Sequence, residues 1–177
     1  AADGGIGELV QYLDTGEKAH AVLAALDDSF VFVPHVCPVN KTSQFHFDGA
    51  TGLLTPNEPA ALVPADENTG PRHICLGPRG DLVYIVNEQG NTVTAHHFDS
   101  VRGTLAAFQT VSTLPADYTE GGNTAHVEVH PNGQWRYASN RGHDSIAAYR
   151  IGDSTSNIIT PSISAPTSPA RSLASWR

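Results

Sequence analysis

The chain has 177 residues, and its 10 Lys and Arg against 18 Asp and Glu give a formal net charge of −8. An acidic chain repels phosphate, so we expect no nucleic acid among its partners. The sequence has no apolar run near the ~18 residues of a membrane-spanning helix and no signal-peptide pattern, so we expect no membrane partner and a cytoplasmic location, although the first residue is Ala1 and a signal could precede it.

A 53-residue repeat organises the chain, with copies that begin at His20, His73 and His126 (73 − 20 = 53; 126 − 73 = 53). Each copy holds an apolar run, a turn cluster such as Pro78–Asp81 and a second apolar run, which predicts a β-hairpin. Two further short runs follow in each copy, so we expect four strands per repeat. Repeats of roughly 40–50 residues with four strands are typical of propeller blades, and the 3.6-residue periodicity of helical repeats is absent.

The predicted fold is therefore all-β, a β-propeller segment of about three four-stranded blades. A β-sandwich would not explain three copies in register. Propellers close with roughly 4–8 blades, so we expect the segment to belong to a larger ring whose remaining blades are its partners. The predicted blades follow the repeat boundaries and cover residues 19–71, 72–124 and 125–170.

The two ends of the chain match the repeat less clearly than its middle does. Residues 1–18 are expected to hold a linker and, over Gly7–Tyr12, the outer strand of a preceding blade. From Ser154 onward the sequence is rich in Ser, Thr and Pro, which favours a flexible tail. Repeat logic instead predicts the fourth strand of the third blade at Ile158–Ile159 and the start of a further blade within 171–177, and both interpretations stay open.

Cysteines and histidines give no recognisable metal site. Cys37 and Cys75 occupy non-equivalent repeat positions, and two cysteines are too few for a disulfide framework, so we expect free thiols. His126 and His130 share one strand face because their spacing is even. No Cys or carboxylate completes a ligand set at a known spacing. We expect neither a metal nor an organic cofactor.

Hairpin geometry predicts a cluster of polar residues at one end of the blades. The start of a blade's first strand lies beside the end of its second strand, so Arg72 falls opposite Asn87 and Glu88. Because the first strand of each blade is innermost, the equivalent positions of all three blades converge around the central channel. The polar residues expected there are His20, His35, Arg72, His73, Glu88, His126, Arg141 and His143.

The residue after the second strand changes from His35 to Glu88 to Arg141 in successive copies (88 − 35 = 53; 141 − 88 = 53). A binding site needs different chemistry from each blade, which would explain the change. A solvated loop position also varies freely, so the residues alone leave both explanations open.

Several stretches resemble the seven-bladed lactonase family, which includes propeller-type 6-phosphogluconolactonases and carboxy-cis,cis-muconate cyclases. They are Gly70–His73, Val86–Glu88 with Asn91–Thr94, Gln109–Pro115 and Ser139–Ile146. The likeness runs from about Ala19 to Ile151 and implies a seven-bladed parent. By motif, the family's site of one His, two Arg and one Glu falls on His20, Arg72, Glu88 and Arg141.

The resemblance implies hydrolysis of an anionic lactone, and the chemistry suggests a role for each catalytic candidate. Glu88 would act as the general base that activates water. Arg72 and Arg141 would bind the anionic group of the substrate or stabilise the oxyanion. His20 would pass a proton to the leaving alkoxide. The alternative for Arg72 and Glu88 is a salt bridge that only closes the blade.

His73 and His143 are further candidates for contacts with the substrate. His73, like His126, also suits a structural hydrogen bond to a backbone carbonyl, because both start their strands at the same repeat position.

The predicted function is hydrolysis of a sugar lactone such as 6-phosphogluconolactone, with no activity expected from these residues without the remaining blades. One alternative is a lactone-forming muconate cyclase that uses the same Glu and His. The other is a non-catalytic binding module, because Tyr84–Asn87 followed by Asn91–Val93 also resembles cell-surface YVTN propellers. Such a module would not need Arg72, Glu88 and Arg141 together.

Overall fold

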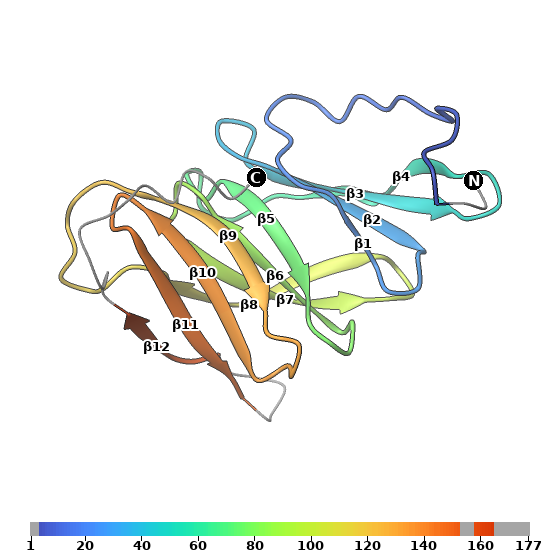
Figure 1. The fold of residues 1–177 in the computed structure, drawn as a ribbon. Helices are drawn as coiled ribbons and strands as arrows, with labels where there is room; N and C mark the ends of the chain where they lie inside the picture. The colour runs from blue at the N-terminus through green and yellow to red at the C-terminus, as the bar shows by residue number, and fades with distance from the viewer. Residues whose placement is uncertain (1–3, 153–157, 165–177) are drawn as a thin grey trace.

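The computed structural model describes residues 4–152 and 158–164, and within them all regular structure is β-strand, in three four-stranded antiparallel sheets (Figure 1). The first sheet contains β1 (Leu23–Ala24), β2 (Phe30–His35), β3 (Lys41–Asp48) and β4 (Leu53–Leu62). The second contains β5 (Pro71–Leu76), β6 (Leu82–Asn87), β7 (Thr92–Asp99) and β8 (Thr104–Ser112). The third contains β9 (Asn123–Val129), β10 (Trp135–Arg141), β11 (Ser145–Ile151) and β12 (Ile158–Ser164).

Within each sheet the strand order follows the chain, so each sheet is a meander joined by short turns. The predicted all-β propeller segment of about three blades is confirmed. The second blade begins with β5 at Pro71, and the third blade begins with β9 at Asn123. Neither described range contains a helix with the length and apolar character to span a bilayer.

Apolar residues on the facing surfaces of neighbouring sheets form the core. Between the first and second blades, Phe32, Val83 and Ile85 are at most 2% exposed. Between the second and third blades, a second cluster is built around Tyr84, Val127 and Tyr149. Burying a side chain of this kind stabilises the fold by about 1.5–3 kcal/mol. Packing between blades therefore sets how the strand ends of different blades meet.

One charged side chain lies inside the second interface. Arg136 on β10 is completely buried, and its three guanidinium nitrogens have no hydrogen-bond partner among the described residues. The guanidinium carbon lies 4.2 Å from the ring centroid of Tyr84 and 5.2 Å from that of Tyr149. Cation–π attraction to two aromatic faces offsets part of the cost of removing the charge from water. Burial lowers the pKa of Arg136.

The segment Gly7–Tyr12, predicted as the outer strand of a preceding blade, belongs to no strand of the three described sheets, and its place in a further blade stays a prediction. It lies along the first blade, where the side chain of Gln11 accepts a hydrogen bond from Leu54 N–H (2.8 Å) and donates one to its carbonyl (3.1 Å). A strand forms through backbone pairing, whereas this contact with β4 uses a side chain.

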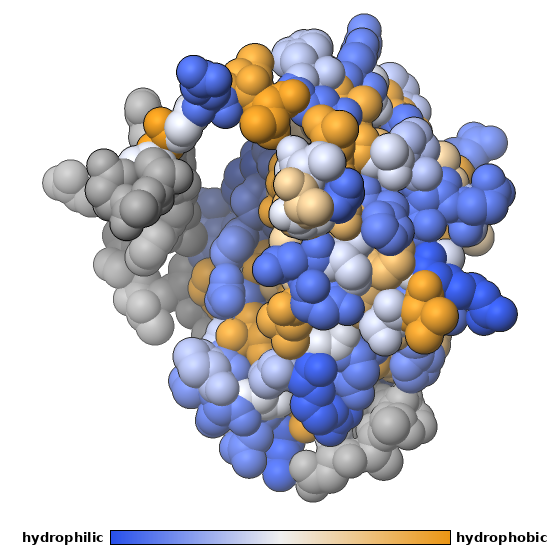
Figure 2. Space-filling model, turned by 90° about the vertical axis from the view of Figure 1, so that its right-hand side faces the viewer, coloured by the Kyte–Doolittle hydropathy of each residue, from blue (hydrophilic) through white to orange (hydrophobic). Residues whose placement is uncertain are grey.

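Figure 2 views the molecule from the side of the N-terminus and shows hydrophobic patches among hydrophilic residues.

The third blade has its fourth strand, because β12 pairs antiparallel with β11. The strand expected at Ile158–Ile159 is thus present and continues to Ser164. Residues 171–177, predicted as a further blade or a tail, lie outside the described residues.

Candidate active site

A β-bulge at the start of β5 presents Arg72. Pro71 pairs with Asn87 and His73 pairs with Val86, so Arg72 is the extra residue between two ladder pairs. Bulges of this kind redirect a side chain and are common beside active sites. Arg72 Nε donates to Glu88 Oε2 at 2.6 Å, and its Nη1 donates to the carbonyl of Ala125 in the next blade.

Glu88 follows β6 directly and is held by its backbone as well as its side chain. Its N–H donates to the carbonyl of Gly70 at 2.7 Å. Its Oε2 accepts from Arg72 and lies 3.0 Å from Arg141 Nη2, while its Oε1 accepts from Gln89 Nε2 at 3.2 Å. We call Arg72, Glu88 and Arg141 the Arg-Glu-Arg cluster. It joins side chains from the second and third blades around the carboxylate of Glu88.

The cluster is partly open to solvent. The side chains of Arg72 and Glu88 are 14% and 15% exposed, whereas that of Arg141 is 50% exposed. Burial and then the charge of Arg141 lower the pKa of Arg72, and the carboxylate of Glu88 opposes this effect. Two guanidinium groups and one carboxylate carry a net charge of +1 within a chain of net charge −8. This local excess of positive charge attracts an anion, and Arg141 is the accessible donor.

Next to the cluster, the three histidines that open the repeat copies form a row. The rings of His20 and His73 are 5.7 Å apart, and those of His73 and His126 are 5.0 Å apart. The Nδ1 atoms of His73 and His126 lie 2.7 Å apart, so one of them donates to the other. Burial, followed by the charge of Arg72, lowers the pKa of His73 to about 4. His73 is therefore neutral at pH 7 and available for hydrogen bonding.

The side chains of two other predicted members of the channel rim make contacts outside the cluster. His35 is completely buried, where its ring nitrogens contact the carbonyl of Glu17 (2.7 Å) and the hydroxyl of Ser43 (3.2 Å), so it connects the N-terminal segment to the first blade. His143 Nδ1 lies 2.7 Å from Ser145 Oγ, and its ring packs edge-on against Tyr118. The role of His143 in substrate binding stays a prediction.

Sequence reasoning missed the groups that hold the cluster in place. Gln89 contacts the carboxylate of Glu88 and also accepts from Cys37 N–H at 3.4 Å. Its position directly after Glu88 is the only sequence signal. The carbonyls of Ala125 and Gly70 carry no signal, because every residue has a carbonyl. Gly70 has a φ of +68°, a left-handed conformation that favours glycine, and a Cβ there would displace the end of the Gln89 side chain.

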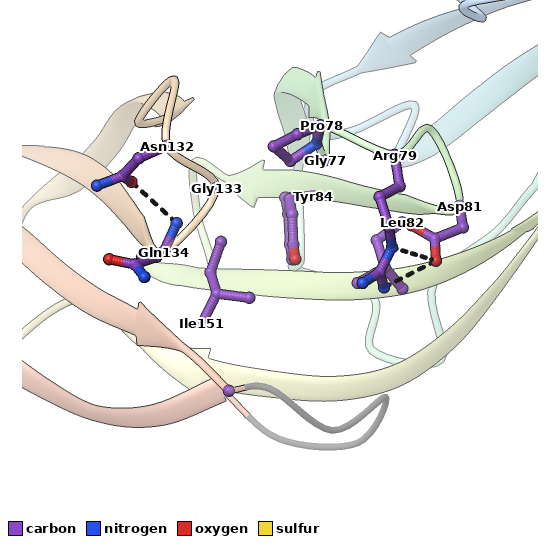
Figure 3. Close-up of a pocket in the computed structure, with 11 residues that line it drawn as sticks. Gly77, Pro78, Arg79, Asp81, Leu82, Tyr84, Asn132, Gly133, Gln134 and Ile151 are labelled. Atoms are coloured by element: carbon purple, nitrogen blue, oxygen red, sulfur yellow. Dashed lines mark hydrogen bonds and ion pairs between the residues drawn. The ribbon is translucent and has the colours of Figure 1, made fainter.

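A cavity of about 300 Å³ lies at the opposite end of the same two blades, between the β5–β6 and β9–β10 turns (Figure 3). Its lining includes Tyr84, Gln134 and the exposed ion pair of Arg79 with Asp81 (2.9 Å), and none of the predicted site residues.

In the part of the chain that the structure describes, no three His, Cys, Asp or Glu residues are grouped so that they could hold a metal ion. Cys37 and Cys75 are free thiols, and burial raises the pKa of Cys75 to about 12.

The fold and this cluster together define a propeller segment whose blades present an anion-attracting group of side chains at one end. Residues 9–166 match the family model described as "Lactonase, 7-bladed beta-propeller". The chain belongs to this family.

Relatives of this chain that carry a functional name are consistent with membership of this family. The chain is 28% identical over 152 residues to a 6-phosphogluconolactonase of Pectobacterium carotovorum, an alignment that covers 86% of this chain and 45% of that protein. It is 33% identical over 100 residues to a 6-phosphogluconolactonase of Bacillus subtilis, covering 56% of this chain and 28% of that protein. The chain thus spans less than half the length of these relatives.

Solved structures show the same architecture. The periplasmic gluconolactonase of Pseudomonas aeruginosa superposes with a TM-score of 0.72 at 20% identity, over 79% of this chain and 39% of that one. Saccharomyces cerevisiae Sqt1 superposes with a TM-score of 0.61 at 10% identity, over 84% of this chain and 35% of that one. At such identities the likeness concerns the fold alone.

Proposed function

We propose that the protein hydrolyses an anionic sugar lactone, with 6-phosphogluconolactone as the first substrate to test. The observation that carries the proposal is the Arg-Glu-Arg cluster, in which a single carboxylate oxygen contacts guanidinium groups from two blades. The family and the names of the relatives support the same chemistry.

The reaction needs a nucleophilic water, a place for the oxyanion and an acid for the leaving group. Arg141, the more exposed guanidinium, binds the phosphate or carboxylate of the substrate and thereby leaves Glu88 Oε2. Glu88 then takes a proton from the water that attacks the lactone carbonyl. Arg72, held by the carbonyl of Ala125, stabilises the negative charge on the carbonyl oxygen.

When the tetrahedral intermediate collapses, the bond from the carbonyl carbon to the ring oxygen breaks. The ring oxygen leaves as an alkoxide and takes a proton from His20, whose ring is exposed at the end of the histidine row. His73, already hydrogen-bonded to His126, contributes a contact to the substrate. The product is the open-chain hydroxy acid.

The first test replaces the proposed base. Glu88→Gln keeps the size of the side chain and removes its basicity, and in the protein that includes the remaining blades we expect kcat for 6-phosphogluconolactone hydrolysis to fall by about 10²–10⁴-fold. Glu58→Gln, at an exposed position of β4, is the matched control and keeps wild-type kcat. Retention of full activity by Glu88→Gln would remove Glu88 from the mechanism.

Two further measurements separate the alternatives. A carboxymuconate cyclisation assay on the same protein distinguishes lactone formation from hydrolysis, because both would use the same carboxylate. Binding of 6-phosphogluconate, measured by calorimetry, tests the anion site without turnover. Binding that is unchanged in Arg141→Met would contradict the role of Arg141.

The cytoplasmic location stays a prediction, because one structural relative is described as periplasmic.

A further inference from the structure

The contact between His73 and His126 constrains where the two rings carry their protons. β5 and β9, the first strands of the second and third blades, run side by side and carry these histidines (Figure 1). Their Nδ1 atoms lie 2.7 Å apart, a hydrogen-bond distance. A neutral imidazole has one N–H that donates and one bare nitrogen that accepts. One of the two Nδ1 atoms is therefore protonated and the other is bare.

The backbone holds both rings in place. The pairing of β9 with β10 is irregular at its start, where Ala125 and His126 lie opposite Ser139. The N–H of His126 donates to the hydroxyl of Ser139 at 3.1 Å, and the carbonyl of Ala125 accepts from Arg72. His73 directly follows Arg72 in the bulge of β5. The contact between the histidines thus belongs to the same arrangement of strand ends as the Arg-Glu-Arg cluster.

Glu128 decides which ring has the proton on Nδ1. Its side chain lies on the same side of β9 as that of His126, two residues away, and Glu128 Oε2 is 3.4 Å from His126 Nε2. A carboxylate at this distance attracts an N–H and repels a lone pair. A neutral His126 therefore carries its proton on Nε2, and its bare Nδ1 accepts. The proton between the two rings belongs to Nδ1 of His73.

This arrangement leaves Nε2 of His73 bare. His73 is only partly buried, and no described residue forms a hydrogen bond with its Nε2. Burial, followed by the charges of Arg72, His126 and His20, lowers the pKa of His73 to about 4, although Glu88 opposes this effect. The ring therefore takes no second proton at pH 7. Its Nε2 accepts hydrogen bonds and does not donate them.

We propose that Glu128 and His126 are positioning residues that hold His73 in the tautomer with a bare Nε2, and that this nitrogen accepts a hydrogen bond from a hydroxyl of the substrate. The substrate contact rests on the proposed lactone hydrolysis, whereas the tautomer does not. The contact narrows the substrate class. A sugar lactone has hydroxyl donors, but ionised carboxymuconate has carboxylate oxygens that would face a lone pair. The site thus favours a polyhydroxylated lactone.

The tautomer is tested by long-range ¹H–¹⁵N NMR of the histidine-labelled 177-residue protein at pH 8, because protonated and bare ring nitrogens differ in chemical shift. We expect the proton of His73 on Nδ1 and that of His126 on Nε2. Glu128→Lys places a cation beside His126 Nε2 and should move both protons to the other nitrogens. Glu58→Lys, the same change at an exposed position of β4, should move neither. The assignment is overturned if wild-type His73 is protonated on Nε2, if His126 carries two protons, or if Glu128→Lys leaves both tautomers unchanged.

Calorimetry tests the hydroxyl contact in the protein that includes the remaining blades. His73→Phe removes the acceptor and should weaken 6-phosphogluconate binding about tenfold, while binding of inorganic phosphate, which Arg141 captures, stays within about twofold. His126→Phe frees the proton of His73 to move to Nε2 and should also weaken 6-phosphogluconate binding. The exposed His130→Phe is its matched control and should bind like wild type.

The outcomes of the two experiments are separate. Wild-type affinity for 6-phosphogluconate in folded His73→Phe and His126→Phe proteins would overturn the hydroxyl contact. If wild type binds neither 6-phosphogluconate nor phosphate, both the contact and the proposed anion site fail. The tautomer of His73 would still stand or fall by the NMR result, which needs no ligand.

Discussion

At the scale of single residues, burial and partners decide what each side chain does. Arg72 and Arg141 are chemically identical, but Arg72 is held between Glu88 and a backbone carbonyl, while half of Arg141 is exposed. We therefore assign anion capture to Arg141 and a fixed stabilising charge to Arg72. Histidines differ in the same way: His20 is exposed, whereas His96 is buried and neutral.

The buried His96 predicts a dependence of stability on pH. Its pKa in the folded state is about 4, below its ordinary value of 6.5, because burial disfavours the charged ring. Between these two values the unfolded chain binds a proton that the folded chain does not, so stability is fully present above pH 6.5 and is lost as the pH falls towards 4. The expected loss for His96 is on the order of 3 kcal/mol.

Urea unfolding from pH 7 to pH 4 measures this loss. His96→Gln should reduce the slope of unfolding free energy against pH, and the exposed His130→Gln should leave it unchanged. An equal slope in wild type and His96→Gln would show that His96 does not contribute to acid sensitivity.

At the scale of elements, two equivalent turns have different neighbours. The β3–β4 turn runs from Asp48 to Gly52, and the β7–β8 turn runs from Asp99 to Gly103. In each, the glycine N–H donates to the aspartate carbonyl at 2.7 Å. Gly52 and Gly103 have φ values of +76° and +66°, but only Gly103 lies against the ring of Phe30 from the neighbouring blade.

Substitution of these glycines should separate backbone strain from packing. Gly52→Ala is expected to cost about 1–2 kcal/mol, because only the left-handed backbone is penalised. Gly103→Ala should cost a further ~1–3 kcal/mol, because its Cβ would overlap the Phe30 ring at the blade interface. Thermal or urea unfolding measures both. Equal losses in the two variants would mean that the interface adjusts freely around Phe30.

At the scale of the whole molecule, the segment before the first repeat covers part of the first blade. Val31, Val33 and Phe45 form a third buried cluster, and Leu13 packs against it. Leu9, in the same segment, is 82% exposed. The N-terminal segment thus shields an apolar face of the first blade without joining its sheet.

Leu13→Ser should uncover this face. We expect a loss of about 1–2 kcal/mol of unfolding free energy, less than for a fully buried leucine, together with stronger binding of an apolar fluorescent dye. Leu9→Ser is the matched control and should change neither quantity. If the two variants behave alike, the contact of Leu13 with the first blade does not contribute to stability.

Much of the architecture could be predicted from the sequence because its determinants are local. Alternating apolar runs and turn clusters at a 53-residue spacing imply four-stranded units. Counting outward from a hairpin turn also places Arg72 beside Glu88, since pairing in a hairpin is set by the turn. The count could not anticipate the bulge that makes Arg72 the extra residue, because a bulge depends on both strands.

The sequence by itself therefore determined the strand-rich repeat, the four-stranded blades of the described residues and the end of the hairpins at which their polar residues gather. Only the tertiary structure decided that His35 is buried, that Arg141 reaches Glu88 across a blade boundary, and that Gly7–Tyr12 lies outside the three described sheets. The physical reason is that turns and strand patterns depend on neighbours in the chain, whereas burial, contacts between blades and cavities depend on packing between residues far apart in sequence.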